Sequence, residues 1–142
     1  MHLRRYRPRP RPSEIVSAVV KILVVVTAAA TGIGRVITET LVANGAQVYI
    51  CDVNESALAA CQRALPTVGT MKADVADEAQ VDRFFEAAVT QLGGIDLLVN
   101  NAGIAGPTAP VEEITLEQWE QTLAVNITGQ FLCTRRATPH LK

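Results

Sequence analysis

Apolar and polar positions along this chain alternate in blocks that favour buried strands and amphipathic helices in turn. Short, continuous apolar runs rich in β-branched residues are typical of parallel strands that are buried on both faces. Such segments, of which the third is the weakest, lie at residues 22–27, 47–51, 68–73 and 95–99. Between them, apolar residues recur at the spacing of helices. We therefore expect strands and helices to alternate within one domain.

Helix ends support this assignment. Asp77 and Gln80 have the spacing of a capping box, which predicts that the best-defined helix begins there. A loop rich in glycine and proline follows the fourth strand, over residues 102–110. A last long helix is expected to open at Thr115, and Pro139 is expected to mark its exit because proline cannot continue the backbone ladder.

The junction between the first strand and the first helix is the most informative segment. It reads Thr-Ala-Ala-Ala-Thr-Gly-Ile-Gly over residues 27–34. Gly32 and Gly34 lack a Cβ and let the backbone approach a pyrophosphate, while the helix directs free N–H groups toward the anion. Asp52 ends the second apolar run, 18 residues past Gly34. This context predicts a dinucleotide site, although a tight turn and a solvated or capping Asp52 are the alternatives.

The expected fold class is α/β. Strands alternating with helices predict a Rossmann-type parallel sheet of order 3-2-1-4 with helices on both faces, incomplete relative to the full dinucleotide-binding fold. Residues 1–14 form a Pro/Arg-rich tail, which we expect to be extended and disordered. Residues 15–142 are expected to form a partial Rossmann dinucleotide-binding domain.

Charge and cysteine usage narrow the function classes. The net charge of the 142 residues is −1, but five of the 13 basic residues lie in the tail, so the rest of the chain is acidic. An acidic body argues against a nucleic-acid partner. The three cysteines fit no metal or redox spacing and are expected to be core residues in a reducing compartment. The two histidines lie near the chain ends, and we expect no metal site.

The basic tail has several interpretations. Transit peptides are rich in arginine and poor in acids, and a secretory signal would use the alanines at 28–30 as its cleavage site. Glu14 and Lys21 interrupt the apolar stretch, which argues against a signal and against a transmembrane helix. We favour a flexible or spurious extension, and expect a cytoplasmic protein without a membrane partner.

Four separated segments resemble the short-chain dehydrogenase/reductase family. Thr27 and Gly32-Ile33-Gly34 resemble its Thr-Gly-x-x-x-Gly-x-Gly turn, and Asp74-Val75 resembles the dipeptide beside the adenine. Asn100-Asn101-Ala102-Gly103 resembles the Asn-Asn-Ala-Gly segment that follows the fourth strand in this family. Asn126 resembles the family's helix asparagine, which supports the active site. The resemblance covers about residues 22 to 142, in order and at family spacing.

The resemblance implies a role for each of these residues. The glycine turn binds the pyrophosphate, with Thr27 as its brace, and Asn126 helps to hold a water relay to the catalytic lysine in a supporting role only. The segment after the fourth strand lines the ribose and nicotinamide. The implied cofactor-binding residues are Thr27, Gly32, Ile33, Gly34, Asp52, Val53, Asp74, Val75, Asn101, Ala102 and Gly103.

The implied cofactor is NAD in preference to NADP. A carboxylate at Asp52 accepts hydrogen bonds from ribose hydroxyls and repels a 2′-phosphate. No lysine or arginine adjoins the site to reverse this preference, because Thr31 precedes Gly32 and Val53 follows Asp52.

The sequence departs from the family pattern at two places. Ala28 stands where the first glycine belongs, and a positive φ there would cost about 1–2 kcal/mol. The family acts through a serine and a Tyr-x-x-x-Lys pair, but the tyrosines here, Tyr6 and Tyr49, have no lysine at that spacing. We expect the catalytic serine, tyrosine and lysine to lie beyond residue 142, so that this chain alone is inactive.

The favoured hypothesis is the cofactor-binding half of an oxoacyl-reductase-like, NAD-dependent oxidoreductase acting on a small alcohol or its ketone. The alternative is a non-catalytic nucleotide-binding or scaffolding fragment that pairs with a full-length homologue, and the last helix is also a possible homo-oligomer contact. A targeted or secreted protein is a third hypothesis. An exposed strand edge and apolar patches on the last helix predict marginal stability.

Overall fold

The computed structural model describes residues 20–141, so the tail over 1–14 and its expected disorder lie outside the described residues. The strands are β1 (Leu23–Val26), β2 (Gln47–Asp52), β3 (Gly69–Lys72) and β4 (Leu97–Val99). The helices are α2 (Gly32–Ala43), α3 (Glu55–Ala64), α4 (Glu78–Leu92), the 3₁₀ turn η1 (Val111–Glu113), α5 (Leu116–Leu123), the π-helical η2 (Ala124–Thr128) and α6 (Gly129–Leu141).

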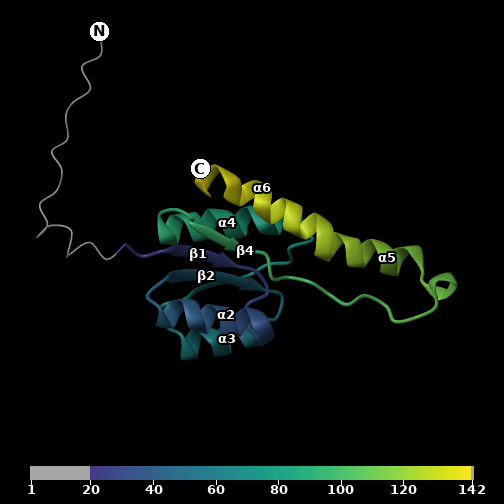
Figure 1. Cartoon of the computed structure of the whole chain (residues 1–142), viewed down its shortest axis with the longest axis horizontal. Helices are drawn as coiled ribbons and strands as arrows, with labels where there is room; N and C mark the ends of the chain where they lie inside the picture. The colour runs from purple at the N-terminus through teal and green to yellow at the C-terminus, as the bar shows by residue number, and fades with distance from the viewer. Residues whose placement is uncertain (1–19, 142) are drawn as a thin grey trace, which may run out of the picture.

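The four strands form one parallel sheet of order β3-β2-β1-β4, as the sequence predicted. In the register of this sheet, Val25 of β1 lies between Tyr49 of β2 and Leu98 of β4. Helices α2 and α3 cover one face, and α4 and α6 cover the other (Figure 1). Since this is the predicted Rossmann-type α/β arrangement, the carboxyl ends of all four strands meet at one edge of the sheet.

Two apolar clusters sandwich the sheet, one on each face. Phe84 and Phe85 of α4 pack with Val25 on one side, whereas Val24 and Val26 point into the cluster on the α2 and α3 side. Consecutive valines therefore serve opposite faces, which explains the unbroken apolar run of β1. The predicted burial of the cysteines is confirmed: all three are buried, and desolvation raises the pKa of the Cys51 and Cys133 thiols to about 12.

Most of the predicted helix ends are confirmed. Asp77 caps α4 by accepting a 3.0 Å hydrogen bond from the backbone N–H of Gln80. Thr115 and Gln118 form a complete capping box at the start of α5. Within residues 20–141, none of the helices has the length and apolar character needed to cross a bilayer.

The predicted exit of the last helix at Pro139 is wrong, because α6 continues to Leu141. Proline at this position removes only the hydrogen bond to the carbonyl of Arg135 and leaves the final turn otherwise intact. The expected single helix is also divided, since the π-helical segment η2 separates α5 from α6. Such segments are frequent at functional sites, and Asn126 lies within this one.

Candidate functional site

A cavity of about 420 Å³ opens at the carboxyl edge of the sheet. Its walls come from the segments that follow the four strands and from the helix across them. The lining residues are Ala28, Asp52, Val53, Ala73, Asp74, Val75, Ala102, Gly103, Ile104, Gln121 and Val125. This is the edge at which open α/β sheets bind their ligands, and the volume lies within the range of small-molecule sites.

The structure brings six of the predicted cofactor residues into this cavity, and they are Asp52, Val53, Asp74, Val75, Ala102 and Gly103. Gly32 and Ile33 lie instead at the exposed start of α2, whereas Thr27 and Gly34 are buried beneath the turn. Asn101 contributes to the same buried region through its side chain. The predicted set therefore divides into residues that line the cavity and residues that shape its floor and rim.

The start of α2 differs from the starts of the other helices. Its N-cap, Thr31, makes no side-chain hydrogen bond, and its first turn holds no acidic residue. By contrast, α3, α4 and α5 each have a capping side chain and a glutamate in the first turn. The free N–H groups and positive dipole end of α2 are thus available to an external acceptor such as a phosphate.

Gly34 has a packing role that sequence reasoning missed. A Cβ at this position would lie 2.5 Å from the carbonyl oxygen of Ala28 and 2.5 Å from Nδ2 of Asn101. Because Gly34 has no side chain, the turn after β1 and the loop after β4 can both pack against the first turn of α2. Gly32 has open space around it but a φ of 57°, so its glycine serves the backbone conformation.

Thr27 joins the same two segments through its hydroxyl group. The side chain is buried, and its Oγ1 accepts hydrogen bonds from the backbone N–H groups of Asn101 and Ala102, both at 3.0 Å. In return, the Asn101 side chain donates to the carbonyl oxygens of Thr27 and Ala28 at 3.1 and 2.9 Å. This exchange fixes the floor of the cavity by coupling segments that are more than 70 residues apart.

The carboxylate of Asp52 is held in place at the end of β2. Its Oδ2 accepts from the backbone N–H of Ala30 at 3.1 Å, and its Oδ1 accepts from that of Asn54 at 3.0 Å. The interpretation of Asp52 as the helix cap is wrong, because Asn54 caps α3 through a 3.0 Å bond from the N–H of Ala57. Each carboxylate oxygen keeps a lone pair for a further donor in the cavity.

Asp74 and Val75 form a wall of the cavity after β3. The Oδ1 of Asp74 accepts from the N–H of Ala76 at 2.9 Å, and its own N–H donates to the side chain of Gln80 at 3.0 Å. Asp74 does not cap α4, because Asp77 fills that position. A conformationally fixed carboxylate therefore stands next to an apolar side chain, a combination suited to a flat heterocycle with a polar edge.

Asn126 is partly buried and hydrogen-bonded. Its Oδ1 accepts from the N–H of Ile104, and its Nδ2 donates to the carbonyl of Ile104, both at 2.8 Å. Trp119, seven residues earlier in the same helical stretch, does not cover it, because Trp119 is itself 55% exposed. The loop after β4 covers the amide instead, so Asn126 holds this loop against η2.

Ile104, Gln121 and Val125 line the cavity without having been predicted. Val125 directly precedes Asn126, and Gln121 lies one helical turn before Val125 on the same face. The spacing of Gln121 and Val125 in the sequence indicates that they share one face of a helix. It does not indicate that α5 and η2 cross the end of the sheet. That placement depends on the loop after β4.

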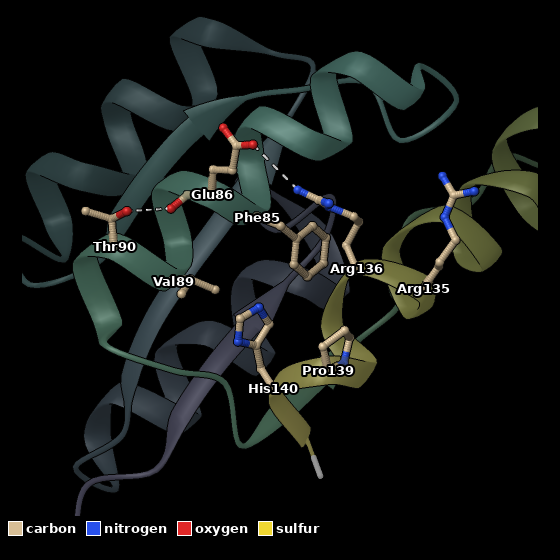
Figure 2. Close-up of a pocket in the computed structure, with 8 residues that line it drawn as sticks. All are labelled: Phe85, Glu86, Val89, Thr90, Arg135, Arg136, Pro139 and His140. Atoms are coloured by element: carbon tan, nitrogen blue, oxygen red, sulfur yellow. Dashed lines mark hydrogen bonds and ion pairs between the residues drawn. The ribbon is translucent and has the colours of Figure 1, made fainter.

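A second cavity, of about 340 Å³, lies between α4 and α6 (Figure 2). Arg136 approaches Glu86 across it, at 3.6 Å, and also pairs with Asp82 at 3.1 Å. Arg135 points away from the cavity in Figure 2 and pairs with Glu78. These charges satisfy one another, and none of the predicted site residues lines this cavity. Among residues 20–141 there is also no cluster of three or more His, Cys, Asp or Glu side chains that could hold a metal ion.

Comparison with known proteins shows similarity to one group of enzymes. A family profile described as "short chain dehydrogenase" matches residues 22–142. The 2-dehydro-3-deoxy-L-rhamnonate dehydrogenase (NAD(+)) of Sphingomonas sp. (strain SKA58) is 32% identical over 117 residues, which are 82% of this chain and 47% of that protein. The chain spans about half the length of the curated relatives it matches.

Solved structures give the same result. The 3-ketoacyl-(acyl-carrier-protein) reductase from Brucella melitensis, complexed with NADH, superposes with a TM-score of 0.81 at 31% identity, over 85% of this chain and 50% of that one. A blue fluorescent protein from a metagenomic library, in complex with NADPH, gives a TM-score of 0.78 at 35% identity, over 84% of this chain and 51% of that one.

Proposed function

Because this chain belongs to the short-chain dehydrogenase family, we propose that it forms the cofactor-binding part of an NAD-dependent oxidoreductase that interconverts a secondary alcohol and its ketone. Members of the family are oxidoreductases of NAD(P), and the relatives of this chain are dehydrogenases and reductases. One observation carries the proposal. The carboxylates of Asp52 and Asp74 and the backbone of Ala102 and Gly103 share one cavity at the carboxyl edge of the sheet.

The residues present fit a dinucleotide. Asp52 would accept from the adenosine ribose hydroxyls, and Asp74 with Val75 would flank the adenine. The uncapped start of α2 would take the pyrophosphate, and Ala102 with Gly103 would face the second ribose and the nicotinamide. When bound, the nicotinamide supplies the hydride acceptor or donor of the reaction.

Asn126 supports this arrangement as a positioning residue. Both polar atoms of its side chain are engaged by the backbone of Ile104, so it fixes the loop that carries Ala102 and Gly103. We propose that none of the residues identified in this chain transfers the proton of the reaction. The chain is therefore proposed to bind cofactor without turning over substrate by itself.

The preference for NAD over NADP rests on Asp52. Its two oxygens are already oriented by Ala30 and Asn54, so the carboxylate cannot easily turn away from a 2′-phosphate. Bringing two negative groups together in a partly buried cavity is unfavourable.

We expect Asp52→Asn to weaken NAD binding by about tenfold and to reduce the preference over NADP, since the amide keeps the shape but not the charge. Isothermal titration calorimetry with both nucleotides measures this. Asp82→Asn is the matched control, because Asp82 pairs with Arg136 away from the cavity and should leave both affinities unchanged. Tighter binding of NADP than of NAD by the unaltered chain would overturn the cofactor preference, and binding of neither would overturn the site.

An exposed apolar face favours the second candidate function, a nucleotide-binding scaffold that pairs with a homologue or a second copy. Large side chains on α5, η2 and α6 follow helical spacing and are exposed by 38% or more, and they are Leu116, Trp119, Leu123, Ile127 and Phe131. Such a patch on a protein surface marks an interaction site.

Sedimentation velocity tests this pairing. We expect the unaltered chain to self-associate at micromolar concentration and Phe131→Glu to shift it toward the monomer, because a carboxylate is costly to bury in an apolar contact. Glu120→Gln, an exposed polar change on α5, serves as the control. A monomer at all concentrations, together with intact NAD binding, would contradict the pairing and leave the cofactor proposal in place.

A further inference from the structure

Ala28 holds a backbone conformation that its side chain disfavours. Its φ is 50°, and among residues 20–141 it is the only non-glycine residue with a positive φ. In this left-handed region, a Cβ is crowded by the carbonyl oxygen that follows it. The preceding and following residues, Thr27 and Ala29, are buried, whereas Ala28 is partly exposed at the cavity.

The surrounding contacts explain why the chain keeps this conformation. The carbonyl oxygen of Ala28 accepts from Nδ2 of Asn101 at 2.9 Å and lies where a side chain on Gly34 would otherwise stand. The next residue, Ala29, donates its backbone N–H to the carbonyl oxygen of Cys51 at 3.1 Å. A more favourable φ would break these interactions, so the strain is imposed by the two segments that meet at the turn.

Ala28 also forms part of the cavity wall. Its carbonyl oxygen is bonded to Asn101, and the residue is partly exposed where it lines the cavity. Asp52 and Val53 line the cavity with it. Ala28 and Asp52 therefore border the same cavity, and we propose that the adenosine ribose binds at its Asp52 end.

We propose that Ala28 limits the affinity of the dinucleotide site, because its methyl group occupies part of the adenosine end and its strained φ destabilises the turn that holds the pyrophosphate. This inference rests on the proposed function. Glycine at this position would remove the methyl group and the strain together. Since a methyl group carries no charge, the effect is the same for NAD and NADP, in contrast to that of Asp52.

The test compares Ala28→Gly with Ala29→Gly. Ala29 is fully buried and does not line the cavity, so it provides a matched loss of one methyl group. Melting temperatures are measured without ligand, and the dissociation constants of NAD, NADP and ADP-ribose are measured by calorimetry. ADP-ribose carries the adenosine, the diphosphate and the second ribose, so it reports on the site without the nicotinamide.

We expect Ala28→Gly to bind all three ligands roughly tenfold more tightly, the low end of the effect of one methyl group in a pocket. Its melting temperature should rise by about 2–5 °C. Ala29→Gly should melt lower and gain no affinity. A change in stability that is equal in the free and the bound protein would leave the dissociation constant of ADP-ribose unchanged. A change in that constant therefore shows an effect on the binding site.

The outcomes separate the inference from the function on which it rests. If the unaltered chain binds NAD and Ala28→Gly binds it no more tightly, the inference fails and the proposed function stands. If neither protein binds any of the three ligands, the proposed function fails and the inference fails with it. If only Ala28→Gly binds at measurable concentrations, the inference is supported, whereas the unaltered chain fails the binding test of the proposed function.

Discussion

Replacing Gly34 with alanine is expected to lower the free energy of unfolding by more than about 3 kcal/mol, or to prevent folding. The added Cβ would lie 2.5 Å from the carbonyl oxygen of Ala28 and 2.8 Å from the Cα of Ala29. Both are backbone atoms, so they cannot rotate away as the end of a flexible side chain could. Relief would require the turn after β1 to separate from α2.

Gly32→Ala provides the comparison for this prediction. A Cβ at Gly32 meets nothing within 4 Å, but φ is 57°, so the expected cost is only the 1–2 kcal/mol or so of a left-handed alanine. Urea denaturation followed by circular dichroism measures both variants. Equal destabilisation by the two substitutions would show that backbone conformation, and not the contact with Ala28, explains the need for glycine at position 34.

These two glycines show how far the sequence could be interpreted. The spacing between a strand and a helix was enough to place both glycines at the turn between β1 and α2, because such turns are built locally. It could not show that Gly34 also makes room for Asn101, which lies 67 positions further along the chain. Contacts between distant segments follow from the assembled sheet and leave no local pattern.

The same distinction applies to the elements. The capping residues Asn54 and Asp77 were predictable because side-chain caps act over a few residues. The strand order was predictable because alternating strands and helices imply a parallel sheet of few possible orders. The division of the last helix by η2 and its continuation through Pro139 were not. A local propensity argument places a stop at proline, but a proline in the last turn removes a single hydrogen bond while α6 remains packed on α4.

Thr27→Val is expected to lower the free energy of unfolding by about 2–4 kcal/mol, because valine has nearly the same shape but no oxygen. The backbone N–H groups of Asn101 and Ala102 would lose their shared acceptor, and the side chain is too buried for water to replace it. Thr27→Ser keeps the hydroxyl group and loses one methyl group, so it should cost only about 1 kcal/mol. Chemical denaturation of the two variants gives this comparison directly.

Hydrogen exchange shows where the Thr27→Val effect acts. We expect the amides of Asn101 and Ala102 to exchange faster in Thr27→Val than in Thr27→Ser, while amides in the α4 core, such as that of Phe85, change only by the global loss of stability. Since Ala102 and Gly103 line the cavity that we propose to hold the cofactor, we also expect Thr27→Val to bind NAD more weakly than Thr27→Ser. If Thr27→Val and Thr27→Ser were equally stable, the hydroxyl group would contribute nothing, and the coupling of β1 to the loop after β4 would have to rest on the Asn101 side chain alone.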